Sequence, residues 1–162
     1  MPREMRRKKQ ELSQSECIAI LERGTSGVLA VLGDDGFPYA VPLSYVCDEG
    51  RLLFHCAPAG HKLDAIERCA KASFCVVDKD DVVAAEYTTY FRSVIAFGRA
   101  RIIRDEADRR QALELLAAKY TPDDEEGRLQ EVDKLIGRTC MVELSIEHLS
   151  GKQAIELVEK RR

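Results

Sequence analysis

One short segment, FHCAPAGHKLDAI at residues 54–66, concentrates the residues that could hold an anion. A strand pattern ends at Cys56, a Pro/Gly turn follows, and helical spacing begins near Lys62. A helix N-terminus exposes unpaired N–H groups and the positive end of its dipole, and both favour a phosphate. Lys62 would add a positive charge, and Gly60 would let the backbone approach closely. The alternative interpretation is an ordinary strand-to-helix turn with an exposed lysine.

The cysteines give no sign of a metal site. The six thiols form no CxxC pair and have no Cys/His spacing suited to zinc, so we predict no metal. Most lie inside apolar runs, where a reduced thiol behaves as a small hydrophobic side chain.

The elements before this segment are predicted to be a helix and a β-hairpin. Ser13 and Glu16 have the spacing of a capping box, and the helix should end with Gly24 in the left-handed conformation. Strands are expected at 28–32 and 37–45, joined by a Gly/Asp turn. The second strand contains Pro38 and Pro42, which cannot donate ladder hydrogen bonds. An edge or a bulge is therefore expected there, either to admit a ligand or simply as a proline-bearing edge.

The rest of the chain is predicted to be mostly strand. Acidic residues 78–81 should form a turn, and a short extended segment should follow at 82–88. Residues 123–126 should form a solvated loop. The last strand should place Val142 and Leu144 on one face and Glu143 on the other, and residues 150–152 should then lead into a short amphipathic tail. Successive strands joined by short turns imply antiparallel pairing and a barrel. Further strands are expected at 51–56, 72–77, 91–103 and from 140, with helices after residues 60 and 105.

Composition limits the classes of partner. The chain has 162 residues, 45% of them hydrophobic, which suits one domain over 1–162. Its 25 basic and 28 acidic residues nearly balance, so neither nucleic acid nor an anionic membrane is an expected partner. The longest apolar stretches are far short of the roughly 20 residues of a membrane-spanning helix. The N-terminus does not have the pattern of a secretory signal, so we expect a cytoplasmic protein.

Five segments together resemble one known family. They are MRRKKQEL (5–12), GFPYAVPLSYV (36–46), LLFHCAPAGHKLDAI (52–66), YFRSVIAFGRA (90–100) and LSGKQA (149–154). Their order and spacing are similar to the FMN-binding split-barrel superfamily of the pyridoxamine 5'-phosphate oxidase type. Within it, the chain most resembles the nitroimidazole-resistance flavoproteins.

The resemblance implies a mainly β (α+β) fold, a six-stranded antiparallel split β-barrel with flanking helices. It also implies a homodimer with two FMN molecules at the subunit interface. The phosphate would lie against the turn at 57–62, and the flavin ring along the strand at 40–44. The FMN-binding residues implied are Val41, Pro42, Leu43, Ser44, His55, Cys56, Ala57, Gly60, His61, Lys62, Leu63 and Ser93.

Two positions qualify the resemblance. Family members often carry a serine where Cys56 stands, and a thiol is the poorer hydrogen-bond partner for phosphate or ribityl oxygens. His55 could contact the flavin ring, donate a proton to a reduced substrate as a catalytic residue, or be a neutral histidine buried in its strand. Pyridoxamine phosphate oxidation itself is disfavoured, because the C-terminal arginine-rich motif of the true oxidases is missing.

Two functions from different classes remain open. The first is an FMN-dependent oxidoreductase that passes electrons from a reduced nicotinamide to a small acceptor such as a nitroaromatic. No GxGxxG fingerprint is present, so a nicotinamide would bind only transiently over the flavin. The second is a flavin-binding module without turnover, either a carrier or a redox sensor. A haem-utilisation or deazaflavin role is a weaker third alternative.

Overall fold

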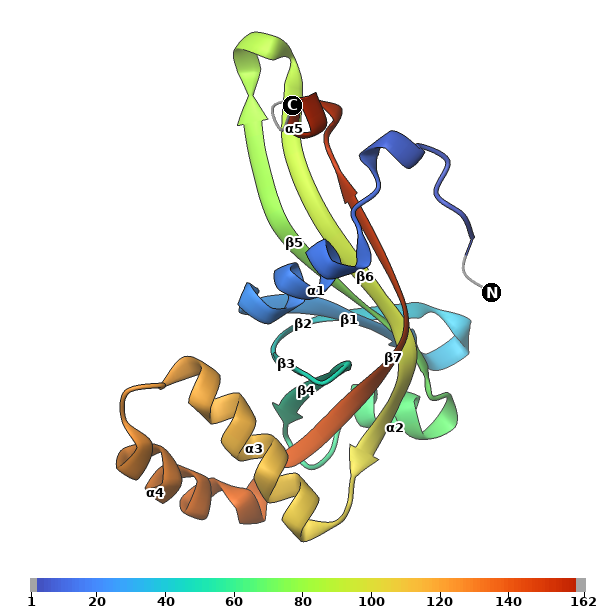
Figure 1. Cartoon of the computed structure of the whole chain (residues 1–162). Helices are drawn as coiled ribbons and strands as arrows, with labels where there is room; N and C mark the ends of the chain where they lie inside the picture. Colours follow the sequence, from blue (N-terminus) through green and yellow to red (C-terminus); the bar gives the residue numbers. More distant parts are fainter. Residues whose placement is uncertain (1–2, 160–162) are drawn as a thin grey trace.

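A continuous, curled antiparallel sheet of seven strands organises residues 3–159, the part of the chain that the computed structural model describes (Figure 1). The strand order is β2-β1-β5-β6-β7-β4-β3, so β2 and β3 are the two edges. Residues 1–2 and 160–162 of the expected domain lie outside the described residues. The strands are β1 (Ser26–Leu32), β2 (Pro38–Ser44), β3 (Val46–Asp48), β4 (Arg51–Cys56), β5 (Lys71–Val83), β6 (Thr88–Ile103) and β7 (Cys140–Gln153).

The strand count exceeds the six that the family resemblance implies because the chain leaves the first hairpin at Tyr45. This residue is fully buried, and its N–H is donated to the Tyr120 hydroxyl (3.1 Å) instead of to a neighbouring strand. Residues after Tyr45 then pair with β4 at the opposite edge, as the short strand β3. The hairpin of β1 and β2 and the edge position of Pro38 and Pro42 are confirmed.

Five α-helices flank the sheet (Figure 1). Helix α4 was not foreseen: the acidic segment expected as a loop supplies Asp124 as its cap, which accepts the Gly127 N–H at 2.9 Å. None of the helices within residues 3–159 is long and apolar enough to cross a membrane. The helices are α1 (Gln14–Arg23), α2 (His61–Arg68), α3 (Glu106–Tyr120), α4 (Glu125–Leu135) and α5 (Ile155–Glu159), with 3-10 turns at Lys8–Gln10, Asp34–Gly36, Ala84–Glu86 and Ile136–Arg138.

The capping box of α1 is confirmed, but the left-handed conformation expected for Gly24 at the end of this helix is wrong. Ser13 accepts the Glu16 N–H, and the Glu16 carboxylate accepts the Ser13 N–H at 2.8 Å. Gly24 has extended backbone angles (φ −65°, ψ 141°) and not left-handed ones. Its role is steric, because a Cβ at this position would overlap the Tyr45 hydroxyl.

Strand β5 runs through the acidic residues that were expected to form a turn. The Asp78 carboxylate binds Arg23 (2.8 Å) and Arg92 (3.3 Å), so its charge is compensated within the sheet. The chain reverses only at 84–87, where Tyr87 adopts a left-handed conformation (φ 52°). The prediction of a separate extended segment at 82–88 is therefore wrong. Strands β5 and β6 instead form one long hairpin that projects from the body (Figure 1).

Strand β7 likewise continues further than expected, through Ser150 to Gln153. Gly151 pairs with Val94 of β6, and a Cβ there would overlap the buried Cys17 sulfur. The missing side chain thus lets α1 pack on the strand.

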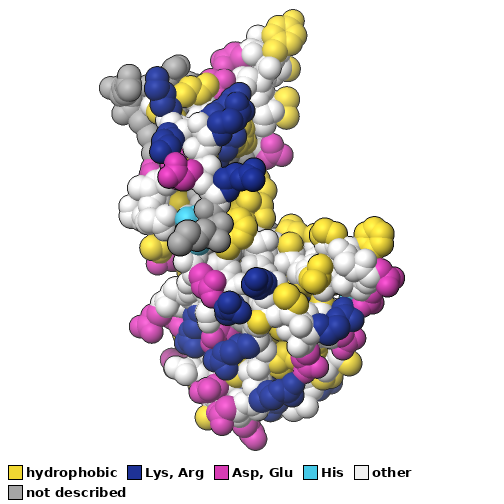
Figure 2. All heavy atoms as spheres, turned by 90° about the vertical axis from the view of Figure 1, so that its right-hand side faces the viewer, with side chains coloured by type: hydrophobic (Ala, Val, Ile, Leu, Met, Phe, Trp, Pro, Cys, Tyr) yellow, Lys and Arg dark blue, Asp and Glu magenta, His cyan; other side chains and the backbone are white. Residues whose placement is uncertain are grey.

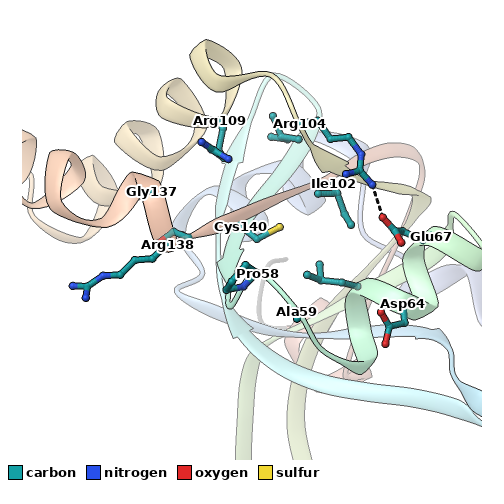
Figure 3. A pocket seen from close by; sticks show the side chains of 13 residues that line it. Pro58, Ala59, Asp64, Glu67, Ile102, Arg104, Arg109, Gly137, Arg138 and Cys140 are labelled. Carbon is teal, nitrogen blue, oxygen red and sulfur yellow. Dashed lines mark hydrogen bonds and ion pairs between the residues drawn. The ribbon is translucent and has the colours of Figure 1, made fainter.

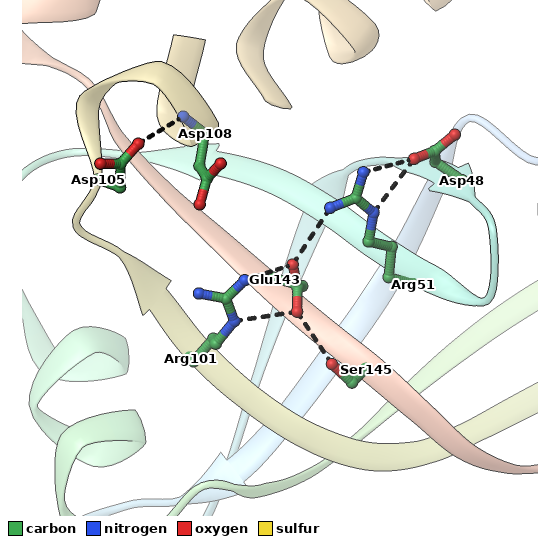
Figure 4. A network of polar contacts seen from close by, with 7 residues as sticks. All are labelled: Asp48, Arg51, Arg101, Asp105, Asp108, Glu143 and Ser145. Carbon is green, nitrogen blue, oxygen red and sulfur yellow. Dashed lines mark hydrogen bonds and ion pairs between the residues drawn. The ribbon is translucent and has the colours of Figure 1, made fainter. Parts of the chain in front are cut away.

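Glu143 lies on the face of β7 opposite to Val142 and Leu144, as the alternation predicted, but its burial was not foreseen: only 6% of the residue is exposed. It lies between Arg101 of β6 and Arg51 of β4, as Figure 4 shows. Burial raises the pKa of Glu143, but hydrogen bonds from Arg101 and Ser145 and the charges of Arg101 and Arg51 outweigh burial and lower it overall. Flanking cations make a buried carboxylate tolerable on this face.

Two hydrophobic clusters lie on opposite faces of the sheet. The larger fills the barrel interior around Phe54 and Phe74, whose rings stack with centroids 6.0 Å apart. The smaller packs α3 and α4 onto the outer face of β4, β6 and β7, with Leu53, Leu113 and Met141 at its centre. This second cluster places the α3–α4 pair beside the end of β4, where the chemically promising segment begins.

Candidate functional site

The turn between β4 and α2 leaves backbone donors free at the start of the helix. Gly60 is the N-cap residue, with φ +140° and no side-chain cap. Its carbonyl accepts the N–H groups of Leu63 (2.9 Å) and Asp64 (3.2 Å). The N–H groups of His61 and Lys62 have no acceptor within residues 3–159, as expected for the first turn of an uncapped helix. The turn therefore offers two adjacent donors to an anion.

Lys62 adds an uncompensated charge to these donors. The residue is half-buried, and no carboxylate in the described part of the chain pairs with it. Its charge acts on the neighbouring Cys56 thiol, which is 8% exposed. Burial, together with the facing Cys140, raises the pKa of Cys56 to about 11, although Lys62 opposes the shift. Cys56 is therefore a protonated, packed thiol at neutral pH.

His61 is fixed by two contacts to the first hairpin. Its ring stacks on Tyr39 of β2, with centroids 4.2 Å apart, and Nε2 accepts the Asp34 N–H at 3.4 Å. Asp34 also pairs with Arg68 at the far end of α2 (2.6 Å). These contacts dock the short helix against β2, so the predicted phosphate turn and the predicted flavin strand are brought side by side.

Strand β2 presents its candidate residues on two faces. Val41 and Leu43 are half-buried against the barrel core, whereas Pro42 and Ser44 are exposed. Because β2 pairs only with β1, its other edge is open along this stretch. Backbone groups of an open edge are available to a flat polar ligand. The residues expected to lie along a flavin are thus on a strand with an open edge.

His55 projects from the outer face of β4 and is exposed, so its interpretation as a buried histidine is wrong. It lines a cavity of about 320 Å³ together with Ser44 of β2. The opposite wall comes from α3 and α4 and is largely apolar, with Leu113, Leu116 and Leu135. Sequence reasoning missed this wall: a helix after residue 105 was expected, but not which strand it would cover, and α4, which supplies Leu135, was not expected at all.

Not every candidate residue lies at this site within one chain. Leu63 is 5% exposed and belongs to the core, and Ala57 is exposed in the turn. Ser93 is on the central strand β6, as expected, but in its projecting half. Seven residues of extended strand, roughly 23 Å, separate it from Ala100, which lies beside α2. Within one chain, Ser93 is therefore distant from the turn before α2.

Comparison with known proteins identifies the family. The family model described as pyridoxamine 5'-phosphate oxidase matches residues 13–153, nearly the whole chain. The protein therefore belongs to this family, as the sequence motifs indicated. No curated protein sequence matches the chain.

Solved structures support the same assignment. A flavocytochrome, Anf3, from Azotobacter vinelandii is 27% identical, with a TM-score of 0.79 over 93% of this chain and 72% of that one. An FAD-binding protein from Mesorhizobium loti is 28% identical, with a TM-score of 0.64 over 90% and 97%. A candidate 5-nitroimidazole antibiotic resistance protein from Bacteroides thetaiotaomicron shares the fold, with a TM-score of 0.75 at 18% identity over 88% and 86%.

Proposed function

We infer that the protein is an FMN-binding flavoprotein that passes electrons from a reduced nicotinamide to a small acceptor such as a nitroaromatic. The observation that carries this proposal is the uncapped α2 N-terminus with the unpaired Lys62, directly beside the open edge of β2. A phosphate fits the first feature and a flat heterocycle fits the second. When bound, FMN would supply the hydride and electron transfer that no side chain can perform.

The chain's own residues would bind and orient the cofactor. The N–H groups of His61 and Lys62 would hold the phosphate, and the edge of β2 from Val41 to Ser44 would lie along the ring. Cys56, a buried and protonated thiol, would contribute packing more than hydrogen bonding. This division of roles leaves the exposed His55 as the candidate proton donor to an acceptor.

The acceptor would enter the cavity between His55 and helices α3 and α4. Its apolar wall favours a small uncharged aromatic compound over a charged one. Ser44 and His55 are the polar groups at its β-sheet side, where they could orient a nitro group or a similar acceptor.

We also propose that the protein acts as a homodimer with the cofactor at the subunit interface. Val77, Val82 and Tyr87 on the projecting hairpin are 62%, 76% and 98% exposed. Figure 2 shows hydrophobic side chains along this projection and the concave side where it meets the body. Such apolar surface favours association. A second subunit seated there is also what would bring a Ser93 to a flavin. Light scattering of the wild-type protein and of Val77→Asp tests this: we expect a dimer that the substitution weakens.

Flavin titration tests the cofactor proposal. We expect the purified protein to bind FMN, with quenching of flavin fluorescence, and Lys62→Ala to weaken binding about tenfold, since a charge-assisted hydrogen bond contributes about 1.5–3 kcal/mol and this one is partly open to solvent. Lys71→Ala is the matched control: Lys71 is exposed on β5 and should leave the affinity unchanged. Equal FMN affinity in the two variants would contradict the assignment of the turn.

The alternative function is a flavin carrier or redox sensor without turnover. The described residues offer no base or nucleophile pair besides His55, and this keeps the alternative open. Steady-state oxidation of NADH and NADPH with a panel of nitroaromatic acceptors separates the two functions. A bound flavin that is neither reduced nor reoxidised would favour the carrier.

A further inference from the structure

A second cavity, of about 350 Å³, opens beside the same turn but is not part of the site described above. It is bounded by the turn, α2, the end of β6, the start of α3 and residues 137–140 (Figure 3). Pro58 and Ala59, which lie between β4 and the phosphate-binding donors, form part of its wall. A ligand there would therefore be next to a phosphate held by α2.

The distinctive group of this cavity is the guanidinium of Arg109. Its Nε atom is buried and has no hydrogen-bond partner within the described residues. No carboxylate there forms an ion pair with Arg109 either. A buried donor without an acceptor is costly, and a charged one more so, unless a ligand supplies the acceptor. Arg109 stands at the α3 side of the cavity in Figure 3.

The charged residues that line the cavity carry a net positive charge. Three arginines line the cavity against the two carboxylates of Asp64 and Glu67. Arg104 is paired with Glu67, and Figure 3 shows Arg138 turned outward. Both carboxylates lie on α2, across the cavity from Arg109. An anion is thus favoured near Arg109 and disfavoured near Asp64.

We propose that the Arg109 cavity binds the diphosphate of an adenine nucleotide, next to the flavin phosphate. A guanidinium offers the planar pair of donors that suits phosphate oxygens. The volume of the cavity is at the lower end of small-ligand sites, about 300–1,000 Å³, so it admits a diphosphate with part of a nucleoside. Ile102 and Pro58 provide the apolar surface that a nucleoside would cover.

The diphosphate could belong to either of two molecules. One is FAD, in which the second phosphate directly follows the first, so that the cavity would extend the flavin site. The other is a nicotinamide dinucleotide acting as donor. In both cases the choice of nucleotide rests on the proposed flavin function, whereas the anion site itself rests on Arg109 alone.

Cys140 provides a local readout of occupancy. Its side chain is half-buried, lines the cavity and faces into it in Figure 3. A nucleotide bound there would shield this sulfur from alkylation. The rate at which N-ethylmaleimide modifies Cys140, followed by peptide mass spectrometry, therefore reports on the cavity without any enzymatic activity.

The experiment titrates the full-length protein with ADP by calorimetry and repeats the alkylation with and without ADP. We expect ADP to bind and to slow Cys140 alkylation at least fivefold, and Arg109→Gln to weaken ADP binding at least tenfold. Arg99→Gln is the control, because Arg99 is exposed on β6 and pairs with Glu147. Arg109→Lys, which keeps the charge but loses the planar fork, replaces the glutamine variant if that variant does not fold. Wild-type protein that neither binds ADP nor protects Cys140 overturns the proposal.

Two further titrations identify the source of the nucleotide and separate this proposal from the flavin site. If the cofactor is the source, Arg109→Gln weakens FAD binding but not FMN binding; if the donor is the source, it weakens NADH binding and leaves both flavins unchanged. ADP binding without FMN binding would refute the proposed function and retain the Arg109 site. FMN binding without ADP binding would retain the proposed flavin function and refute the Arg109 site.

Discussion

The buried Glu143 allows a stability prediction that can be worked out from distances. Its carboxylate accepts two hydrogen bonds from Arg101 (3.0 and 2.9 Å) and one from Ser145 (2.9 Å), and it lies 3.5 Å from Arg51. In Glu143→Gln the charge is lost, and an NH2 group replaces one acceptor and faces guanidinium donors. The substitution therefore removes at least one arginine contact.

The loss in free energy of unfolding depends on how strongly solvent screens the contacts of Glu143. A hydrogen bond to a charged group contributes about 1.5–3 kcal/mol. The Glu143 side chain is 8% exposed, but that of Arg101 is 56% exposed, which reduces the value of their pair. We expect the free energy of unfolding to fall by about 2 kcal/mol at pH 7. For a chain of this length, that is a decrease in Tm of about 4–8 °C.

The contribution of Glu143 to stability should also depend on pH. Because the folded protein lowers the pKa of Glu143, the unfolded state binds its proton more readily. The stabilisation is fully present above the ordinary carboxyl pKa of about 4.3 and is lost as the pH falls through the lowered folded value. The difference in stability between wild type and Glu143→Gln should therefore shrink as the pH falls below about 4.3.

Urea denaturation at pH 7, 5, 4 and 3 is the assay, with Glu147→Gln as control. Glu147 lies on the same strand and also pairs with one arginine, Arg99 (2.8 Å), but both side chains are 59% exposed. Its substitution should cost under about 0.5 kcal/mol. A difference for Glu143→Gln that is the same at pH 7 and pH 3, or no larger than that of the control, would refute the reasoning.

Two further substitutions test how the fold positions the site. Gly98→Ala should cost more than about 2 kcal/mol or prevent folding, since a Cβ would overlap a β7 carbonyl, whereas Gly137→Ala, with open space around it, should change the thermal melting temperature little. Tyr120→Phe should cost about 1–2 kcal/mol in a denaturant titration because the buried Tyr45 N–H loses its acceptor. Tyr87→Phe, at a 98% exposed position, should be neutral, and an equal loss in both tyrosine variants would contradict the role given to this contact.

Local signals in the sequence predicted the elements best. The capping box of α1, the Gly/Asp turn of the first hairpin and the prolines of its edge strand act through neighbouring residues, so their pattern is legible in the chain itself. The same holds for the uncapped glycine turn before α2, on which the candidate site depends. The errors were made where a distant partner compensates a polar residue. Asp78 continues β5 because of Arg23 and Arg92, and Glu143 is buried because of Arg101.

The sequence by itself determined the family, the antiparallel strand pattern and the turn that could hold a phosphate. Only the tertiary structure decided what surrounds that turn. It laid α3 and α4 over the outer face of β4, exposed His55 to the resulting cavity, and left the Nε atom of Arg109 buried without an acceptor within the described residues, in a second cavity that Pro58 also lines. These outcomes depend on pairs of residues far apart in the chain, whose packing and charge compensation no local spacing encodes.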